Sequence, residues 1–181
     1  IETACDIARQ CDGMRCDMAM LVLNDVFAAT WGHRVGDPPD EDYWPERIQA
    51  VRRNCADFLF IAEAYWGRET DLLNQGFDLC YDKVLYDRLL FGDAASVRAH
   101  LSAPEEWQER LLRFLENHDE PRAADAFPHG RHEAAALVAA TVPGGRLFHE
   151  GQEEGRRIRL PVFAARRPEE PVDSSLRAWY E

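Results

Sequence analysis

Three carboxylates in this sequence directly follow segments that are expected to be strands. Glu63 ends a long apolar run, Asp17 follows a short mixed stretch, and Asp119 comes shortly after the apolar Leu111–Leu115. An ionised carboxylate can act as a nucleophile or a base, and a protonated one can act as an acid. The alternative for Glu63 is that it only caps a following helix or meets solvent, as most glutamates do.

Arg15 stands two residues before Asp17. Side chains two apart on a strand lie on the same face, so the two are expected to point the same way. A nearby guanidinium keeps a carboxylate ionised, which is the state that a nucleophile needs. The other interpretation of this pair is a purely structural ion pair.

A polar cluster, Glu116–Pro121, follows Leu111–Leu115 directly. Its members have no evident packing role, and the proline ends regular structure. A lone His118 is most often a structural histidine, but here it stands beside Asp119 after an apolar strand. We interpret the pair as part of a polar site.

The stretch Asp57–Trp66 is the most informative one for the fold. It is rich in aromatic and branched residues and lacks alternation, which favours a strand covered on both faces in a parallel sheet. In such sheets the functional residues lie at the carboxyl ends of the strands, where Glu63 stands.

Other segments complete a strand and helix alternation, which predicts an α/β fold with parallel strands. Trp44, Ile48, Val51 and Cys55 form an apolar stripe expected to pack on the sheet. Thr30–Asp42 is expected to be a loop. Further strands are expected at Gly13–Ala19, Phe77–Asp82, Leu111–Leu115 and Arg146–His149, and helices at Ile1–Gln10, from Asp42, at Arg68–Gln75, Glu105–Arg113 and Arg131–Val142, and near Ser174.

The composition is that of an ordinary globular chain, with 46% hydrophobic and 30% charged residues. No apolar run is long enough to span a bilayer, so no membrane association is expected. The net charge of −12 argues against nucleic acid as a partner, and a neutral sugar fits better.

The five cysteines form an odd set without zinc-ligand spacing, which favours reduced thiols and the cytoplasm. The chain opens at Ile1 without an initiator Met, so a missing upstream segment could hold a signal peptide. His129, His132 and His149 match no zinc signature and are expected to be surface or loop residues. No metal site and no cofactor are predicted.

Four motifs carry a resemblance to a known family. Gly13–Asp17, Ile61–Ala64 and Phe114–Asp119 resemble, in order, the three catalytic motifs of the alpha-amylase family of glycoside hydrolases. Pro143–Gln152 resembles the family's last-strand motif. The similarity covers roughly Asp12–Gly155. Three motifs in the family's order and at compatible spacing argue against a chance match.

The resemblance implies a role for each carboxylate. Asp17 would be the nucleophile, Glu63 the acid/base, and Asp119 the transition-state stabiliser. Arg15 and His118 would contact the nucleophile or the sugar. A retaining glycosidase needs one ionised and one protonated carboxylate. Arg15 is expected to keep Asp17 ionised, while its negative neighbours favour the protonated form of Glu63.

Tyr65 and Trp66 follow the acid/base directly, and they either stack on a pyranose ring or pack inside the barrel. The implied substrate is an α-linked glucose oligosaccharide or polysaccharide. The implied reaction is hydrolysis by double displacement. The alternatives are an α-glucan transglycosylase with the same residues, or a non-catalytic family member used for binding.

The resemblance implies a (β/α)8 TIM barrel, and a complete one needs ~250 residues. The family's earlier motif, an Asp followed four residues later by Asn-His, is absent from this chain. We therefore expect residues 1–181 to form a partial catalytic barrel domain of about five βα units, truncated at both ends. Such a chain is expected to be inactive by itself.

Overall fold

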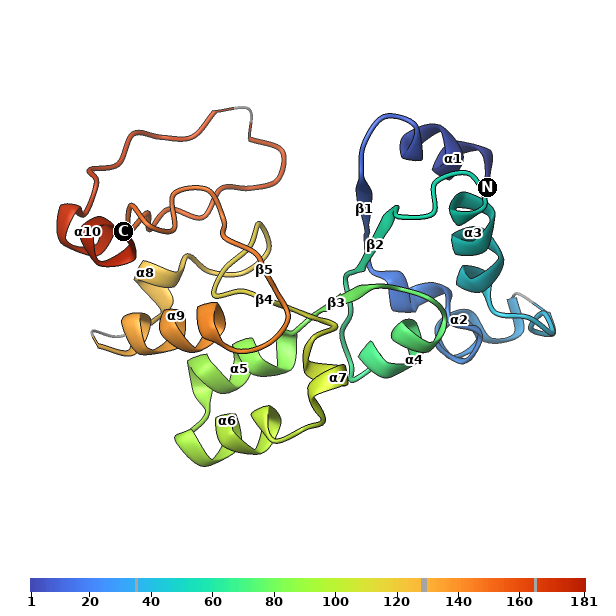
Figure 1. Cartoon of the computed structure of the whole chain (residues 1–181), viewed down its shortest axis with the longest axis horizontal. Coiled ribbons are helices and arrows are strands. Elements are labelled where there is room, and N and C mark those ends of the chain that lie inside the picture. The colour runs from blue at the N-terminus through green and yellow to red at the C-terminus, as the bar shows by residue number, and fades with distance from the viewer. Residues whose placement is uncertain (35, 128–129, 165) are drawn as a thin grey trace. The chain divides into compact units, whose positions relative to one another are not determined.

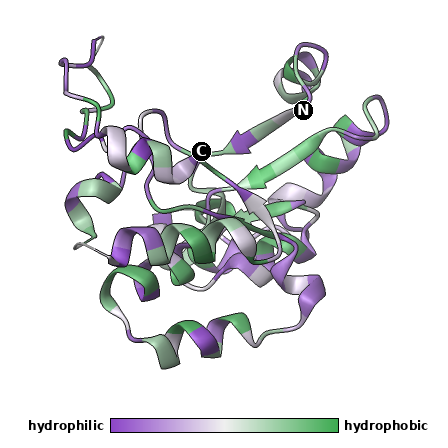
Figure 2. Cartoon of the chain, turned by 60° about the vertical axis from the view of Figure 1, so that its left-hand side comes forward, coloured by the Kyte–Doolittle hydropathy of each residue, from purple (hydrophilic) through white to green (hydrophobic). Residues whose placement is uncertain are grey.

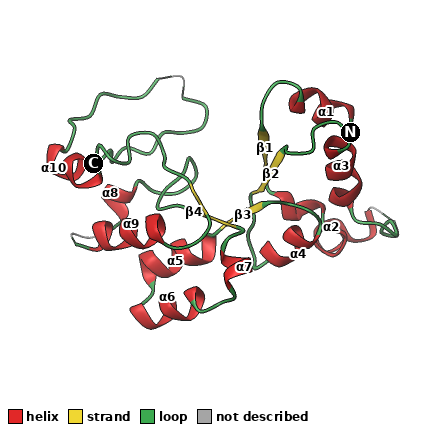
Figure 3. Ribbon diagram, in the orientation of Figure 1, coloured by secondary structure: helices red, strands yellow, loops and turns green. Residues whose placement is uncertain are grey.

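The computed structural model describes residues 1–34, 36–127, 130–164 and 166–181. The chain divides into two compact units, residues 1–83 and 84–181 (Figure 1). Helices and short strands alternate along the chain (Figure 3). Within the described ranges, no helix has the length and apolar character needed to cross a membrane.

The first unit is built on three parallel strands. Strand β1 pairs with β2, and β2 pairs with β3. Helices carry hydrophobic residues on one side and hydrophilic residues on the other (Figure 2). The strands are β1 Gly13–Cys16, β2 Leu59–Ala62 and β3 Leu79–Tyr81, and the helices are α1 Glu2–Ala8, η1 Ala19–Val22, α2 Asn24–Trp31, η2 Gly32–Arg34, α3 Tyr43–Arg52 and α4 Glu69–Asn74.

The register of β1 on β2 decides which side chains meet. Arg15 lies beside Ile61, and Cys16 lies beside Ala62. Continuing this register by one residue brings Asp17 to the level of Glu63. Gly13 is required at the start of the pair, because a Cβ there would lie 2.7 Å from the carbonyl oxygen of Leu59.

Strand β2 is covered on one face only, so the prediction of a strand buried on both faces is wrong for this chain. Phe60 and Ala62 are buried, whereas Leu59 is 37% exposed and Ile61 is half-buried. Successive side chains of a strand point to opposite faces, so the second face lacks the cover that a closed barrel would supply.

The predicted apolar stripe of α3 is confirmed as packing. Ile48 and Val51 are buried. The indole of Trp44 stands edge-on to Phe77, with centroids 4.9 Å apart, and its N–H donates to the carbonyl of Ala19 at 2.9 Å. The stripe therefore joins the helix to the sheet and to the loop after β1.

The second unit contains two parallel strands with the register Leu112 beside Gly145. Tyr86 and Phe114 stack at 5.4 Å in its core. Its strands are β4 Leu111–Arg113 and β5 Gly145–Arg146, and its helices are α5 Lys83–Phe91, α6 Ala94–Leu101, α7 Glu105–Gln108, α8 Ala123–Ala126, α9 Arg131–Thr141 and α10 Ser174–Tyr180, the first of which begins at the boundary between the units.

Strands alternate with helices and every pair given above is parallel, so the predicted α/β class is confirmed. Several bounds differ from the predictions. Helix α7 ends at Gln108 rather than Arg113, because β4 takes up the chain from Leu111. Strand β5 is only two residues long, and α2 occupies the beginning of the predicted loop Thr30–Asp42.

Candidate active site

One guanidinium joins two of the predicted carboxylates. Nη1 of Arg15 lies 2.6 Å from Oδ1 of Asp17, and Nη2 lies 2.5 Å from Oε1 of Glu63. All three residues stand at the carboxyl ends of the neighbouring strands β1 and β2. The structure therefore brings together the predicted nucleophile, the predicted acid/base and the predicted arginine.

The two carboxylates lie in opposite environments. The side chain of Asp17 is 77% exposed, whereas Glu63 as a whole is 1% exposed. Asp17 is therefore open to a ligand from solvent. The predicted alternative for Glu63, a solvent-exposed residue, is wrong.

Glu63 is fixed by the loop that follows β1. Its Oε2 accepts the backbone N–H of Met18 at 2.7 Å, and its backbone oxygen accepts the N–H of Ala19 at 3.0 Å. Met18 has a φ of 43°, in the left-handed region, so the chain turns sharply there. The turn that closes on Glu63 is the one that carries Asp17.

Arg15 is supported by more than its two carboxylates. Its guanidinium carbon lies 5.7 Å from the ring centroid of Tyr81 on β3. Burial lowers the pKa of Arg15, but the hydrogen bond to Asp17 and the charge of Glu63 raise it to a net value above the ordinary one. The guanidinium therefore stays charged between the two carboxylates.

The two aromatic residues after β2 differ in position. The hydroxyl of Tyr65 donates to Oε1 of Glu63 at 3.4 Å, and its ring is half-buried. Trp66 is 66% exposed and adopts a φ of 62°. Trp66 therefore is not packed into the core of this unit, and its ring is accessible to a ligand.

The second unit positions His118 and Asp119 on a tight turn. The side-chain oxygen of Asn117 accepts the backbone N–H groups of Asp119 and Glu120, at 2.8 and 2.9 Å. Nε2 of His118 lies 3.0 Å from Oδ2 of Asp119, and both side chains are partly exposed. Because these residues belong to the other unit, their convergence with Asp17 and Glu63 stays a prediction.

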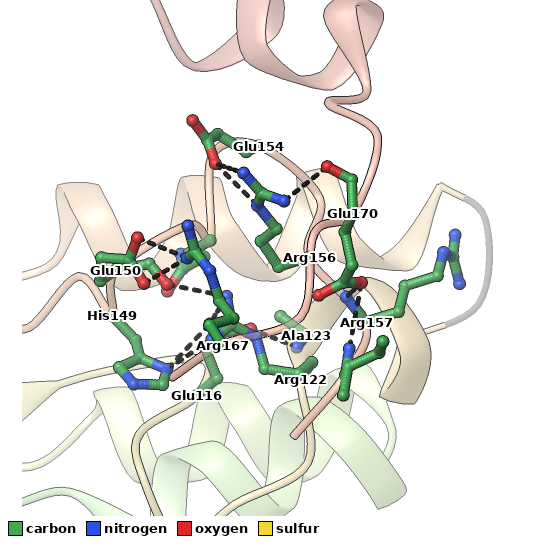
Figure 4. A network of polar contacts seen from close by, with 12 residues as sticks. Glu116, Arg122, Ala123, His149, Glu150, Glu154, Arg156, Arg157, Arg167 and Glu170 are labelled. Carbon is green, nitrogen blue, oxygen red and sulfur yellow. Dashed lines mark hydrogen bonds and ion pairs between the residues drawn. The ribbon is translucent and has the colours of Figure 1, made fainter. Parts of the chain in front are cut away.

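One member of the polar cluster, Glu116, has a structural role that the sequence did not reveal. Glu116 is fully buried, and its Oε1 lies 3.0 Å from Nη2 of Arg122 and 3.2 Å from Nδ1 of His149. Its Oε2 accepts the backbone N–H of Ala123. Figure 4 shows these groups converging from the loop after β4 and the loop after β5.

The charges in this network are strongly perturbed. Burial raises the pKa of Glu116 to about 7, against the opposing effects of the Ala123 amide and the Arg122 charge. Burial and the charge of Arg122 also lower the pKa of His149. The network joins the two loops beside the turn that carries Asp119, so it is suited to positioning that turn.

The histidine predictions need correction. His132 is buried in α9, and its Nε2 lies 2.8 Å from the hydroxyl of Tyr180. His149 is in a loop, as predicted, but it is half-buried and bonded to Arg122. His129 lies outside the described residues. The missed partners are far apart in sequence, and only the unusual density of polar groups at Glu116–Pro121 could have pointed to them.

No protein-family model matches the chain. A curated relative, alpha-amylase MalA of Haloarcula japonica, is 29% identical over 173 residues, which cover 90% of this chain and 23% of that protein. The resemblance to the alpha-amylase family is confirmed. Two solved structures are similar to the chain in fold.

A cyclomaltodextrinase matches with a TM-score of 0.73 and 21% identity, over 99% of this chain and 31% of that one. A cyclic α-maltosyl-(1→6)-maltose hydrolase from Arthrobacter globiformis, in complex with maltose, matches with a TM-score of 0.66 and 22% identity, over 97% of this chain and 41% of that one. These structural neighbours are TIM-barrel enzymes, so the predicted fold of this chain, a partial (β/α)8 barrel, is confirmed. The chain spans less than half of each relative.

Proposed function

We propose that this chain is the carboxyl-terminal part of the catalytic barrel of a retaining glycoside hydrolase that acts on α-glucosidic bonds. The observation that carries the proposal is the bridge from Arg15 to both Asp17 and Glu63 at two neighbouring strand ends. The similarity to an alpha-amylase over 90% of the chain supports it. The substrate would be an α-linked glucose oligosaccharide or polysaccharide.

Asp17 has the properties of the attacking group. It is exposed, and its contact with Arg15 holds the carboxylate at the strand end, where it could form a bond to the anomeric carbon. In double displacement, the leaving sugar oxygen takes a proton from the second carboxylic acid, and a water later attacks the glycosyl-enzyme with that residue as base. Asp119, paired with His118, would stabilise the transition state.

Glu63 would be the acid/base, and its contacts support one of its two oxygens as the carrier of the proton. Oε2 accepts an N–H of the backbone, so the proton has to sit on Oε1, the oxygen that faces Arg15 and Tyr65. A guanidinium cannot accept a proton or a hydrogen bond. A proton on Oε1 would therefore be donated away from Arg15, towards the leaving sugar oxygen, while Oε1 still accepts from Tyr65.

The test is carried out on the protein with its complete barrel, using maltooligosaccharides and proton NMR of the anomeric signals. Retention predicts that the first product formed is the α-anomer. We expect no turnover in Asp17→Asn. In Glu63→Gln, turnover should fall about 10²–10⁴-fold on maltooligosaccharides and much less on an aryl α-glucoside, whose leaving group needs no proton.

Asp6→Asn is the matched control, because Asp6 is an exposed carboxylate that pairs with Arg9 on α1, away from the proposed site. It should retain full activity. Full activity in Asp17→Asn, or an initial β-anomer, would overturn the proposal. Disproportionation products in place of hydrolysis would assign a transglycosylase with the same residues, and sugar binding without either product would assign a non-catalytic role.

The proposed compartment is the cytoplasm. All five cysteines are free thiols, including the exposed Cys11, which suits a reducing compartment. The net charge of −12 supports the exclusion of nucleic acid as a partner.

A further inference from the structure

The second unit contains a polar cavity of about 460 Å³ that has no role in the proposed chemistry. It lies among α8, α9 and α10 and the loop residue Arg157. Its walls combine two large aromatic side chains, Phe127 and Trp179, with several charged ones, which is the composition of a pocket that orients a ligand by a few polar contacts. The residues that matter below are Asp125, His132, Glu133, Arg157 and Trp179.

Trp179 supplies the apolar wall. It is 43% exposed, and its ring packs edge-on against Tyr180, with centroids 5.0 Å apart. The hydroxyl of Tyr180 bonds to His132 at 2.8 Å and to Gln152 at 3.1 Å. An exposed indole on a supported helix offers a flat apolar face, while its N–H stays available as a polar edge.

Glu133 supplies an acceptor that lacks a donor. It lines the cavity, and its Oε2 is buried without a hydrogen-bond partner among the described residues. The half-buried carboxylate as a whole lines the cavity, so it can accept a hydrogen bond from a ligand there. Asp125 adds an exposed carboxylate on the same cavity.

Arg157 supplies donors. Its backbone N–H is bonded to Glu170, and Figure 4 shows its guanidinium extending away from that contact. Carboxylates that accept and a guanidinium that donates match the hydroxyl groups of a sugar, each of which does both. The acidic side chains disfavour phosphorylated or carboxylated ligands.

We propose that this cavity binds a neutral α-glucan segment, separately from the bond-cleaving residues. A glucose ring would lie on the face of Trp179, and its hydroxyls would donate to Glu133 and Asp125 and accept from Arg157. The choice of an α-glucan over other neutral sugars rests on the proposed function. The cavity itself rests on the described side chains alone.

The test titrates the 181-residue chain with maltoheptaose and follows tryptophan fluorescence and calorimetric heat. Trp179→Ala should weaken binding at least about tenfold, and Glu133→Gln about tenfold, since a charge-assisted hydrogen bond becomes a neutral one. Trp31→Ala is the matched control, because Trp31 is an exposed indole in α2 of the other unit. It should leave the affinity unchanged.

Two further arms make the result specific. Trp66→Ala removes the exposed indole beside the proposed active site, and the Trp179-dependent binding should persist in it. Cellohexaose, the β-linked counterpart, should bind at least about tenfold more weakly than maltoheptaose. Unchanged affinity in both Trp179→Ala and Glu133→Gln, or equal affinity for the two sugars, would overturn the proposal. If Trp179→Ala does not fold by circular dichroism, Glu133→Gln decides.

Binding is measured here without turnover, so the two proposals fail separately. Binding that depends on Trp179 in a protein without hydrolysis leaves the glucan site standing and removes the proposed function. Hydrolysis in a protein whose maltoheptaose binding ignores Trp179 and Glu133 removes the glucan site alone.

Discussion

The stability of this chain should depend on pH through the buried Glu116, and Glu116→Gln should remove that dependence. The folded-state pKa of Glu116 is raised from 4.5 to about 7 by burial. The folded state therefore holds a proton over a pH range in which the unfolded state has lost it. Stability from this residue is fully present below about pH 4.5 and falls as pH rises to about 7.

The magnitude follows from the size of the shift. Each unit of pKa difference is worth about 1.4 kcal/mol, so the wild-type free energy of unfolding should fall by about 3 kcal/mol across this range. Glutamine does not titrate, so the difference in stability between Glu116→Gln and wild type should move by the same amount. His149 has its pKa lowered and acts in the opposite direction below about pH 6.5, and because it contacts Glu116 the comparison is made in a His149→Gln background.

Urea unfolding followed by tryptophan fluorescence, at pH values from about 5 to about 8, measures this difference. Glu154→Gln is the control, because Glu154 has its pKa lowered by Arg156 and so has finished titrating below this range. A pH-independent difference between Glu116→Gln and wild type would refute the reasoning. It would mean that Arg122, 3.0 Å away, outweighs burial and keeps Glu116 charged.

Three further predictions concern the packing around the sites. Arg122→Met should cost about 1–3 kcal/mol in urea unfolding at neutral pH, because it removes the contacts of the buried guanidinium with Glu116, His149 and the carbonyl of Glu150, and the double variant with Glu116→Leu should recover part of this. Gly13→Ala should cost about 1–3 kcal/mol, since its Cβ meets a backbone oxygen at 2.7 Å; a neutral result contradicts the β1 register. Trp44→Phe should cost about 1 kcal/mol by removing the hydrogen bond to Ala19, and a cost near zero would show that this bond is dispensable.

Local patterns predicted the elements that position the first carboxylates. The apolar run before Glu63 and the stripe of α3 each carried a clear period or length signal, and both elements formed. Helices α5 and α6 were not predicted, although α5 buries Leu85 and Leu89 one turn apart and α6 opens with a capping box. Both signals are visible in the sequence, but neither helix carries a predicted site residue.

Contacts between distant segments were the part that the sequence could not supply. The ion pair of Arg15 with Asp17 follows from their spacing on one strand, but the contact of Arg15 with Glu63 depends on the register between two strands. The same limit applies to Glu116, whose partner His149 is 33 residues away. Nothing local distinguishes such a buried glutamate from a catalytic one.

Strand β1 has its partner β2 on one side, and among the described residues it pairs with no strand on the other. An unpaired edge presents free N–H and C=O groups in the spacing that another strand recognises. A separately expressed piece of barrel that ends in a parallel strand could pair with this edge of β1, close to Arg15 and Asp17. Joining two polypeptides at this edge would complete the proposed sugar cleft, so that the proposed activity would depend on the concentration of the complementing piece.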